Sequence, residues 1–321
     1  MSAGSPRRGL VLGAGGVLGA AWTTGALAAV QAEYGWDPRE AEVLIGTSAG
    51  SVLAASLGCG IGVDTLVAHQ QGVVLEGEPQ IEYDHDTGAG GALPPLPRPG
   101  IASARGMLRV ARRPRRATPM MALSTVLPRG RGSIEAVGRL VDTVLPDGGW
   151  APHPQTWIVT MDVHSSRRVV FGREGSHPAA LRDAVMASCS IPGWYAPVRI
   201  GTHDYVDGGA CSPTSLDLVA KLGLDEVVVL SPMTSLDYDA PTTVAGRLER
   251  RLRRLVTKRL VGEVRKVAAT GTRITLLGPG AEDLSAIGAN LMDARRRRQV
   301  LDTSLRTSVA AVRAQGLRPV G

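Results

Sequence analysis

The sequence predicts an α/β fold in which a mainly parallel central sheet is covered by helices. Two strand–turn–helix units follow one another within the first 60 residues, and the same alternation returns between residues 213 and 230. Hydrophobic residues make up 44% of the 321 residues and charged residues 20%, as in an ordinary globular protein with a sizeable core. We therefore expect one domain that spans residues 1–321.

Each of the two amino-terminal units contains a short buried strand, a glycine-containing turn and a helix. Apolar runs indicate the strands, glycines indicate the turns, and the composition after each turn favours a helix. The segments are, in order, a strand at Gly9–Leu12, a glycine loop at 13–19, a helix at 20–34, a strand at Val43–Ile45, a turn at 46–50 and a helix at 51–57. Both turns thus follow a strand and precede a helix.

The middle of the chain is predicted to contain a long flap at about 76–132. Its first part, residues 76–100, is rich in glycine and proline and does not favour a long regular element. No acidic residue lies between Asp86 and Glu135, where arginines accumulate. They include Arg105, Arg109, Arg112, Arg113, Arg115, Arg116, Arg129 and Arg131. Two interpretations are open, a flexible loop with solvated arginines and a cover that meets an anionic surface.

Strands and helices alternate again after the flap. The pattern predicts strands at 157–163 and 168–171, a helix at 178–188, strands at 194–200 and 204–206, a helix at 213–222 and a strand at 226–230. We therefore expect the sheet to end near residue 231 and a helical extension to occupy about 240–321.

The extension opens with a long helix after Pro241, in which apolar and basic residues fall on different faces. The apolar stripe contains Leu248, Leu252, Leu255, Leu260, Val264 and Val267. The other face contains Arg247, Arg250, Arg251, Arg253, Arg254, Lys258, Arg259, Arg265 and Lys266. Such a helix packs on a sheet, which is the commoner arrangement, or lies on an anionic membrane. The basic run Arg295–Arg298 is interpreted as a solvated helix face.

The net charge of +7 at pH 7 raises the question of a polyanionic partner. Nearly all the cations are arginines, which a codon bias would also explain, and aromatic residues are only 3% of the chain. Because single-strand binders use aromatic stacking, we expect no nucleic-acid partner.

The three cysteines are odd in number and lack metal-ligand spacing, so neither disulfides nor a metal site is expected.

The apolar segment Leu10–Val30 follows Arg7 and Arg8, as in a signal peptide, but it contains five glycines and is interpreted as mature structure. We therefore expect a cytoplasmic protein, with peripheral contact to a membrane as an open alternative.

Gly46-Thr47-Ser48-Ala49-Gly50 is a G-x-S-x-G pentapeptide between a predicted strand and a predicted helix, which is the context of a nucleophile elbow. So sharp a turn brings strand and helix together, and Gly46 and Gly50 provide the two positions that must lack a Cβ atom. Ser48 is then expected at the carboxyl edge of the sheet, at a helix N-terminus. The simpler alternative is an ordinary glycine turn, because the pentapeptide alone often arises by chance.

The glycine loop Gly13–Gly19 also follows a strand and opens a helix, which directs several backbone N–H groups toward one point. In acyl transfer the negative charge at such a point is the tetrahedral oxyanion. A dinucleotide site is the competing interpretation, but Leu18 stands where G-x-G-x-x-G requires its third glycine.

Asp207-Gly208-Gly209 follows the predicted strand that contains Tyr205 and Val206. A carboxylate there accepts the Ser48 proton if burial raises its pKa, although Asp-Gly is also a strong turn signal. His203 is the histidine nearest in sequence, and a Ser-His-Asp hydrolase remains open.

Together these segments resemble the patatin-like phospholipase family over roughly residues 8–231. The resemblance rests on the glycine loop, the pentapeptide, Ala187-Ser188-Cys189-Ser190-Ile191-Pro192-Gly193 followed by Pro197, and Tyr205-Val206-Asp207-Gly208-Gly209. It implies a three-layer α/β/α fold and the cleavage of lipid acyl esters by a Ser-Asp dyad, without metal or cofactor.

By residue, the resemblance makes Ser48 the nucleophile and Asp207 the base of a two-step reaction through an acyl-enzyme. The implied oxyanion hole is formed by the N–H groups of Gly15, Gly16 and Val17. The glycines that support these motifs are Gly13, Gly19, Gly46, Gly50, Gly208 and Gly209. Leu18 replaces a basic residue that is usual in the family, which bears on loop orientation or headgroup preference. A catalytically weak lipid-binding or regulatory protein is the alternative, and the oligomeric state is not predicted.

Overall fold

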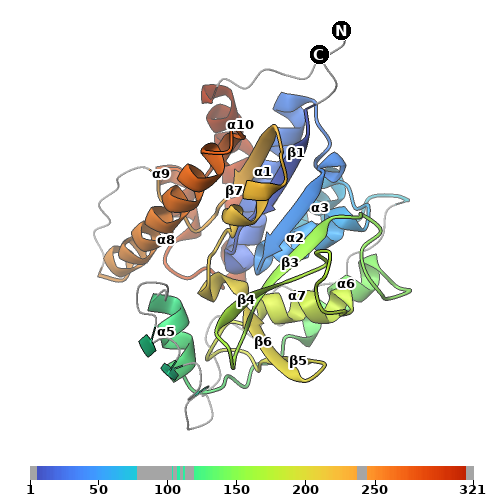
Figure 1. Ribbon diagram of the computed structural model, residues 1–321. Coiled ribbons are helices and arrows are strands. Elements are labelled where there is room, and N and C mark those ends of the chain that lie inside the picture. The colour runs from blue at the N-terminus through green and yellow to red at the C-terminus, as the bar shows by residue number, and fades with distance from the viewer. Residues whose placement is uncertain are drawn as a thin grey trace.

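The computed structural model describes residues 6–77, 103, 107–108, 111–112, 119–236 and 244–315. Much of the predicted flap therefore lies outside the described residues. The fold is α/β, with a mainly parallel central sheet between layers of helices (Figure 1), and the predicted fold class is confirmed.

The strands form one sheet in the order β5-β6-β3-β2-β1-β7-β8, with β4 paired to β3 outside this path. They are β1 (Arg8–Leu12), β2 (Val43–Thr47), β3 (Thr156–Asp162), β4 (Arg167–Phe171), β5 (Val198–Ile200), β6 (His203–Asp207), β7 (Glu226–Leu230) and β8 (Arg273–Leu277). β1, β2, β3, β7 and β8 pair in parallel, whereas β4, β5 and β6 join the sheet antiparallel.

The helices cover both faces of the sheet. They are α1 (Gly16–Tyr34), α2 (Ala49–Gly58), α3 (Val63–Gln71), α5 (Pro119–Val126), α6 (Glu135–Val144), α7 (Leu181–Cys189), α8 (Val244–Ala268), α9 (Ala281–Ile287) and α10 (Arg297–Ala314). Short 3-10 helices are η1 (Pro38–Glu40), η3 (Gly208–Ala210), η4 (Leu216–Lys221) and η5 (Ala294–Arg296). In the described part of the chain, no helix combines the length and the apolarity needed to cross a membrane.

Alternating side chains of β1 divide the core between the two faces of the sheet. Leu10 and Leu12 pack with apolar residues of α1, α2, α3 and α10. Val11 points the other way and packs with residues of η4 and of the second half of α8. The buried strands thus read as continuous apolar runs, as expected for parallel strands covered on both faces.

Strand β3 has two successive partners along one of its edges. β2 pairs with its first half, where Thr47 lies opposite Val159, and β6 pairs with its second half, where Asp207 lies opposite Thr160. β4 occupies the other edge, because it pairs with the same β3 residues that the ends of β2 and β6 contact. β2 and β6 therefore run toward each other along one edge of β3, and their carboxyl ends meet.

Several predicted boundaries differ from the structure. α1 begins at Gly16, inside the predicted glycine loop, and the helix predicted at 213–222 is the shorter 3-10 helix η4. The strand predicted at 194–200 is confined to β5, since Tyr195 lies outside it in an isolated bridge with Gly132. Pro197, which has no N–H to donate, precedes the first residue of β5.

The carboxy-terminal extension differs more. The sheet does not end near residue 231, because β8 adds a parallel strand beside β7. The apolar stripe predicted for the long helix packs only in part: Leu260 and Val267 of α8 are buried, whereas Leu248, Leu252 and Leu255 are exposed.

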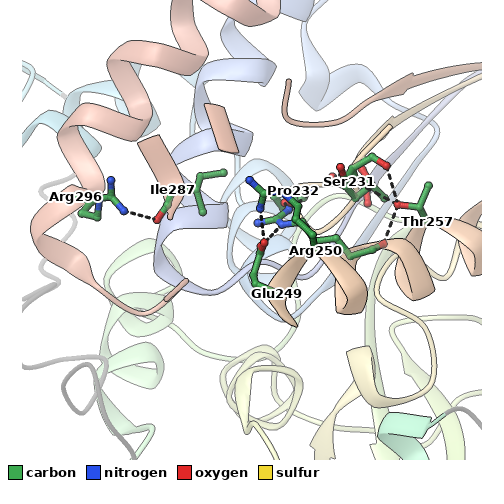
Figure 2. A network of polar contacts seen from close by, with 10 residues as sticks. Ser231, Pro232, Glu249, Arg250, Thr257, Ile287 and Arg296 are labelled. Atoms are coloured by element: carbon green, nitrogen blue, oxygen red, sulfur yellow. Dashed lines mark hydrogen bonds and ion pairs between the residues drawn. The ribbon is translucent and has the colours of Figure 1, made fainter. Parts of the chain in front are cut away.

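The basic run Arg295–Arg298 is a solvated helix face only in part. Arg295 and Arg298 are exposed, as predicted. Arg296 instead donates a hydrogen bond to the carbonyl oxygen of Ile287 at 3.3 Å (Figure 2). It donates another to the carbonyl oxygen of Ser285 at 3.0 Å. These bonds connect η5 to α9.

Candidate active site

Ser48 lies in the sharp turn between β2 and α2, with φ 54° and ψ −126°. A positive φ is strained for a residue other than glycine and persists only where the surroundings fix it. The Ser48 carbonyl oxygen accepts hydrogen bonds from the N–H of Ser51 at 2.7 Å and from its hydroxyl at 2.6 Å. The Ser48 side chain is thus placed at the N-terminus of α2, where the helix dipole favours negative charge.

The two glycines of the pentapeptide stand where a side chain has no room. A Cβ atom on Gly46 would lie 2.5 Å from the carbonyl oxygen of Gly50, and one on Gly50 would lie 2.1 Å from that of Leu12. Backbone atoms cannot move aside as a flexible side chain can. The approach of α2 to β1 and β2 therefore requires glycine at both positions.

Asp207, the last residue of β6, lies beside Ser48 because the ends of β2 and β6 meet on β3. The Asp207 carboxyl group accepts the Gly209 N–H at 2.7 Å, and the Ser48 side chain lies close enough to lower the pKa of this carboxyl group. The two residues are only 5% and 6% exposed. Burial raises the pKa of Asp207 to about 6, although Ser48 and the Gly209 N–H act to lower it.

The end of α7 and the residue after it hold both partners in place. The Ser188 hydroxyl accepts the Ser48 N–H at 2.9 Å and donates to the Val159 carbonyl of β3 at 2.7 Å. The Asp207 N–H donates to the Ser190 carbonyl at 2.9 Å. The sequence analysis included both serines in a family segment but gave neither a role, because residue type alone does not show which backbone groups a serine binds.

The glycine loop is anchored on both sides of its centre. The N–H groups of Gly13, Ala14 and Leu18 donate to distant carbonyl oxygens, those of Leu230 at 2.9 Å, Pro213 at 2.8 Å and Leu291 at 3.0 Å, respectively. Gly15, Gly16 and Val17 lie between these anchors, at the start of α1. Since the first N–H groups of a helix have no acceptor within it, these amides can stabilise an anion.

Packing around the loop comes partly from the carboxy-terminal third of the chain. A Cβ atom on Gly15 would lie 2.6 Å from Pro232 Cγ, and one on Gly16, which has φ 60°, would lie 2.9 Å from Met292 Sδ. Leu18 is fully buried in the core, so this position places no charge at the site. No sequence signal indicated that residues 230–292 would contact the loop.

An apolar pocket of about 90 Å³ lies beside Ser48 and shares Gly16 and Val17 with the glycine loop. Its other walls come from α1, α2, α3, α6, α7 and two later segments. They are formed by Ala20, Ala49, Val52, Leu53, Ser56, Leu66, His69, Gln70, Ile134, Val137, Leu140, Cys189, Ile191, Tyr195 and Met292. Such a lining suits a hydrocarbon chain attached to a carbonyl group at Ser48.

A comparison with known families agrees with this geometry. The family model for patatin-like phospholipase matches residues 10–220. The chain belongs to the patatin-like phospholipase family. No curated protein sequence matched it. The matched range of this patatin-like protein contains the glycine loop, Ser48 and Asp207, but it ends before Pro232 and Leu291, which contact the loop.

The histidines bear on the alternative of a Ser-His-Asp hydrolase. The Nδ1 atom of His203 lies 2.7 Å from the Oδ2 atom of Asp162. The Nε2 atom of His153 lies 2.7 Å from the carbonyl oxygen of Ala41. Of the histidines in the described ranges, His69 is the one that lines the pocket with Ser48. Within the same ranges, no cluster of three or more His, Cys, Asp or Glu side chains is arranged to hold a metal ion.

Proposed function

We propose that this patatin-like protein is a serine acyl hydrolase that cleaves lipid acyl esters through Ser48 and Asp207. The observation that carries the proposal is the buried pair of Ser48 and Asp207, close enough for the Ser48 side chain to lower the pKa of the Asp207 carboxyl group, beside an apolar pocket. Membership of the patatin-like phospholipase family supports the same reaction class and a lipid substrate.

In the first step the Ser48 oxygen attacks the ester carbonyl carbon, and Asp207 takes the hydroxyl proton. The bond to the leaving alcohol then breaks, and the alcohol receives that proton from Asp207. Water attacks the acyl-enzyme in the second step, again with Asp207 as base, which releases the carboxylic acid and restores Ser48. A pKa of about 6 suits this role, because the carboxylate is mostly ionised at neutral pH yet basic enough to accept a proton.

The tetrahedral intermediate of each step carries a negative charge on oxygen. We assign its stabilisation to the N–H groups of Gly15, Gly16 and Val17, aided by the N-terminus of α2. The acyl chain would occupy the apolar pocket beside Ser48. Neither assignment needs a charge at Leu18.

The alternative is a lipid-binding or regulatory protein with little turnover. The observation in its favour is the buried Leu18 at a position that is usually basic in the family. This alternative predicts that acyl esters bind in the pocket but are not cleaved.

The test is hydrolysis of short- and medium-chain p-nitrophenyl esters by the wild type and three variants, each shown to be folded by circular dichroism. We expect Ser48→Ala and Asp207→Asn to lose nearly all activity, and His69→Gln to retain most of it. Activity that survives Ser48→Ala would refute the mechanism. Loss in His69→Gln with retention in Asp207→Asn would instead favour a serine–histidine arrangement, and an inactive wild type that binds a fatty acid would favour the binding protein.

A further inference from the structure

The first half of α8 directs three leucines outward and two of its arginines inward. Leu248, Leu252 and Leu255 lie at i, i+4 and i+7 on one side of the helix and are 60%, 48% and 53% exposed. On the opposite side Arg250 and Arg253 are buried. This is the reverse of the orientation expected for a helix that packs on an apolar core.

A buried polar network fixes this orientation. Arg253 forms an ion pair with Glu249 and donates a hydrogen bond to the carbonyl oxygen of Pro232. One turn later, the Thr257 hydroxyl accepts the N–H of Ser235 at 3.0 Å. Figure 2 shows Glu249 and Thr257 on the side of α8 that faces residues 231–232. Because the helix extends beyond the end of β7 here, its inner side meets backbone carbonyl groups instead of apolar side chains.

Rotation of α8 to bury the leucines would break this network. The ion pair of Arg253 and Glu249 lies within the helix and would survive, but the carbonyl oxygens of Pro232 and Thr234 would lose the hydrogen bonds that Arg253 donates to them, and a buried polar group left without a partner is costly. The leucines therefore stay at the surface as a contiguous stripe. An apolar stripe held at the surface in this way indicates an interaction site.

The exposed side of α8 is basic and has no acidic side chain. Arg251 and Lys258 lie beside the leucines. An open groove next to them is lined by Ser235, Arg254, Thr257, Lys258, Val261, Gly262 and Arg265. The acidic residues of the helix, Glu249 and Glu263, face inward, with side chains only 13% and 8% exposed. The partner of this surface must therefore combine apolar and anionic chemistry.

We infer that this α8 face, formed by Leu248, Leu252, Leu255, Arg251 and Lys258, binds the surface of an anionic phospholipid bilayer. The leucines enter the boundary of the acyl region, and the cations remain at the level of the phosphate groups. A nucleic acid would match the cations but leave the leucines in water. A neutral bilayer would match the leucines alone.

The α8 face is connected to the candidate active site. Arg253 binds the carbonyl of Pro232, and the ring of Pro232 packs against Gly15 and Gly19 of the glycine loop. These contacts link the inner side of α8 to the glycine loop. The docking itself can be measured without hydrolysis and does not rest on the proposed function.

The experiment is co-sedimentation of the full-length protein with vesicles of ether-linked phospholipids, which contain no ester to cleave. Vesicles of phosphatidylcholine alone are compared with an equal mixture of phosphatidylcholine and phosphatidylglycerol. One variant carries Leu248→Ser, Leu252→Ser and Leu255→Ser, and a second carries Arg251→Gln and Lys258→Gln. The matched controls change exposed residues elsewhere. They are Val73→Ser, Val74→Ser and Leu75→Ser in the segment after α3, and Arg298→Gln on α10.

We expect the wild type to bind the anionic vesicles, to bind neutral ones weakly and to be released by salt. Both α8 variants should bind the anionic vesicles at least about tenfold more weakly, because the leucines that enter the bilayer and the cations near its surface both contribute to binding. The control variants should bind like the wild type, and all should keep the thermal stability of the wild type and its rate on a soluble ester.

Three results would overturn the inference. The first is a wild type that does not bind anionic vesicles. The second is a leucine variant that binds them as tightly as the wild type does. The third is binding to single-stranded RNA that is as tight as vesicle binding and insensitive to the leucine changes, which would identify a polyanion site instead.

Discussion

Replacement of Asp207 by asparagine should abolish activity and, at neutral pH, make the protein more stable. The side chain is buried, and burial raises its pKa from 3.8 to about 6. A carboxyl group with a raised pKa binds its proton more tightly in the folded chain than in the unfolded one. Its ionisation therefore opposes folding, and this cost is absent at low pH and complete only above pH 6.

The size of the effect follows from the two pKa values. A difference of about 2 pH units corresponds to about 3 kcal/mol at pH 8, about half of that at pH 5 and little below pH 4. Asparagine has nearly the same shape, can accept the Gly209 N–H and never ionises. Asp207→Asn should therefore raise the free energy of unfolding by up to about 3 kcal/mol at pH 8, and by about half as much at pH 5.

The assay is urea unfolding of wild type and variant at both pH values, beside the pH profile of kcat/KM for the wild type. All other carboxyl groups are shared, so the difference between the two proteins isolates Asp207. The rate should fall on the acid side of pH 6, to about one tenth of its plateau at pH 5. A variant that is less stable than the wild type at pH 8, or whose stability difference does not change with pH, would refute the reasoning.

Two further predictions concern the turn at Ser48. Gly50→Ala places a Cβ atom 2.1 Å from a backbone oxygen and should lower the free energy of unfolding by about 3 kcal/mol or more. Gly262→Ala, on the exposed side of α8 with open space around it, should instead raise the free energy of unfolding by about 0.5–1 kcal/mol. Equal effects of the two substitutions in denaturant unfolding would contradict the packing described. Ser188→Ala leaves the Ser48 N–H and the Val159 carbonyl without their shared partner and should cost about 1–3 kcal/mol and lower kcat more than it changes KM. An unchanged kcat in a folded Ser188→Ala variant would show that Ser48 does not need this support.

The amino-terminal half of the fold could be predicted because its constraints are local. Gly46 and Gly50 are required by the shape of one turn, and an apolar run followed by glycines identifies β1 and β2 without knowledge of the rest. Asp207 could be singled out by its place in a family segment, but its burial and its position beside Ser48 depend on the pairing of distant strands with β3.

The carboxy-terminal half was predicted less well because its environment is set by tertiary structure. A periodic apolar stripe predicts burial only where a core lies opposite, and α8 is longer than the sheet that it covers. Leu248 therefore faces solvent, while Arg253 binds the carbonyl of Pro232. Strand β8 was missed because five residues between two helical segments give a weak pattern, and the contact of Leu291 with the glycine loop has no local signal at all.

The meeting of β2 and β6 on β3 means that the spacing of Ser48 and Asp207 is set by sheet register. A shift of one residue in either pairing would move one side chain by about 3.3 Å and turn it to the other face of the sheet. The exposed side of α8, in contrast, belongs to neither pairing. Its residues can therefore change without moving Ser48 or Asp207.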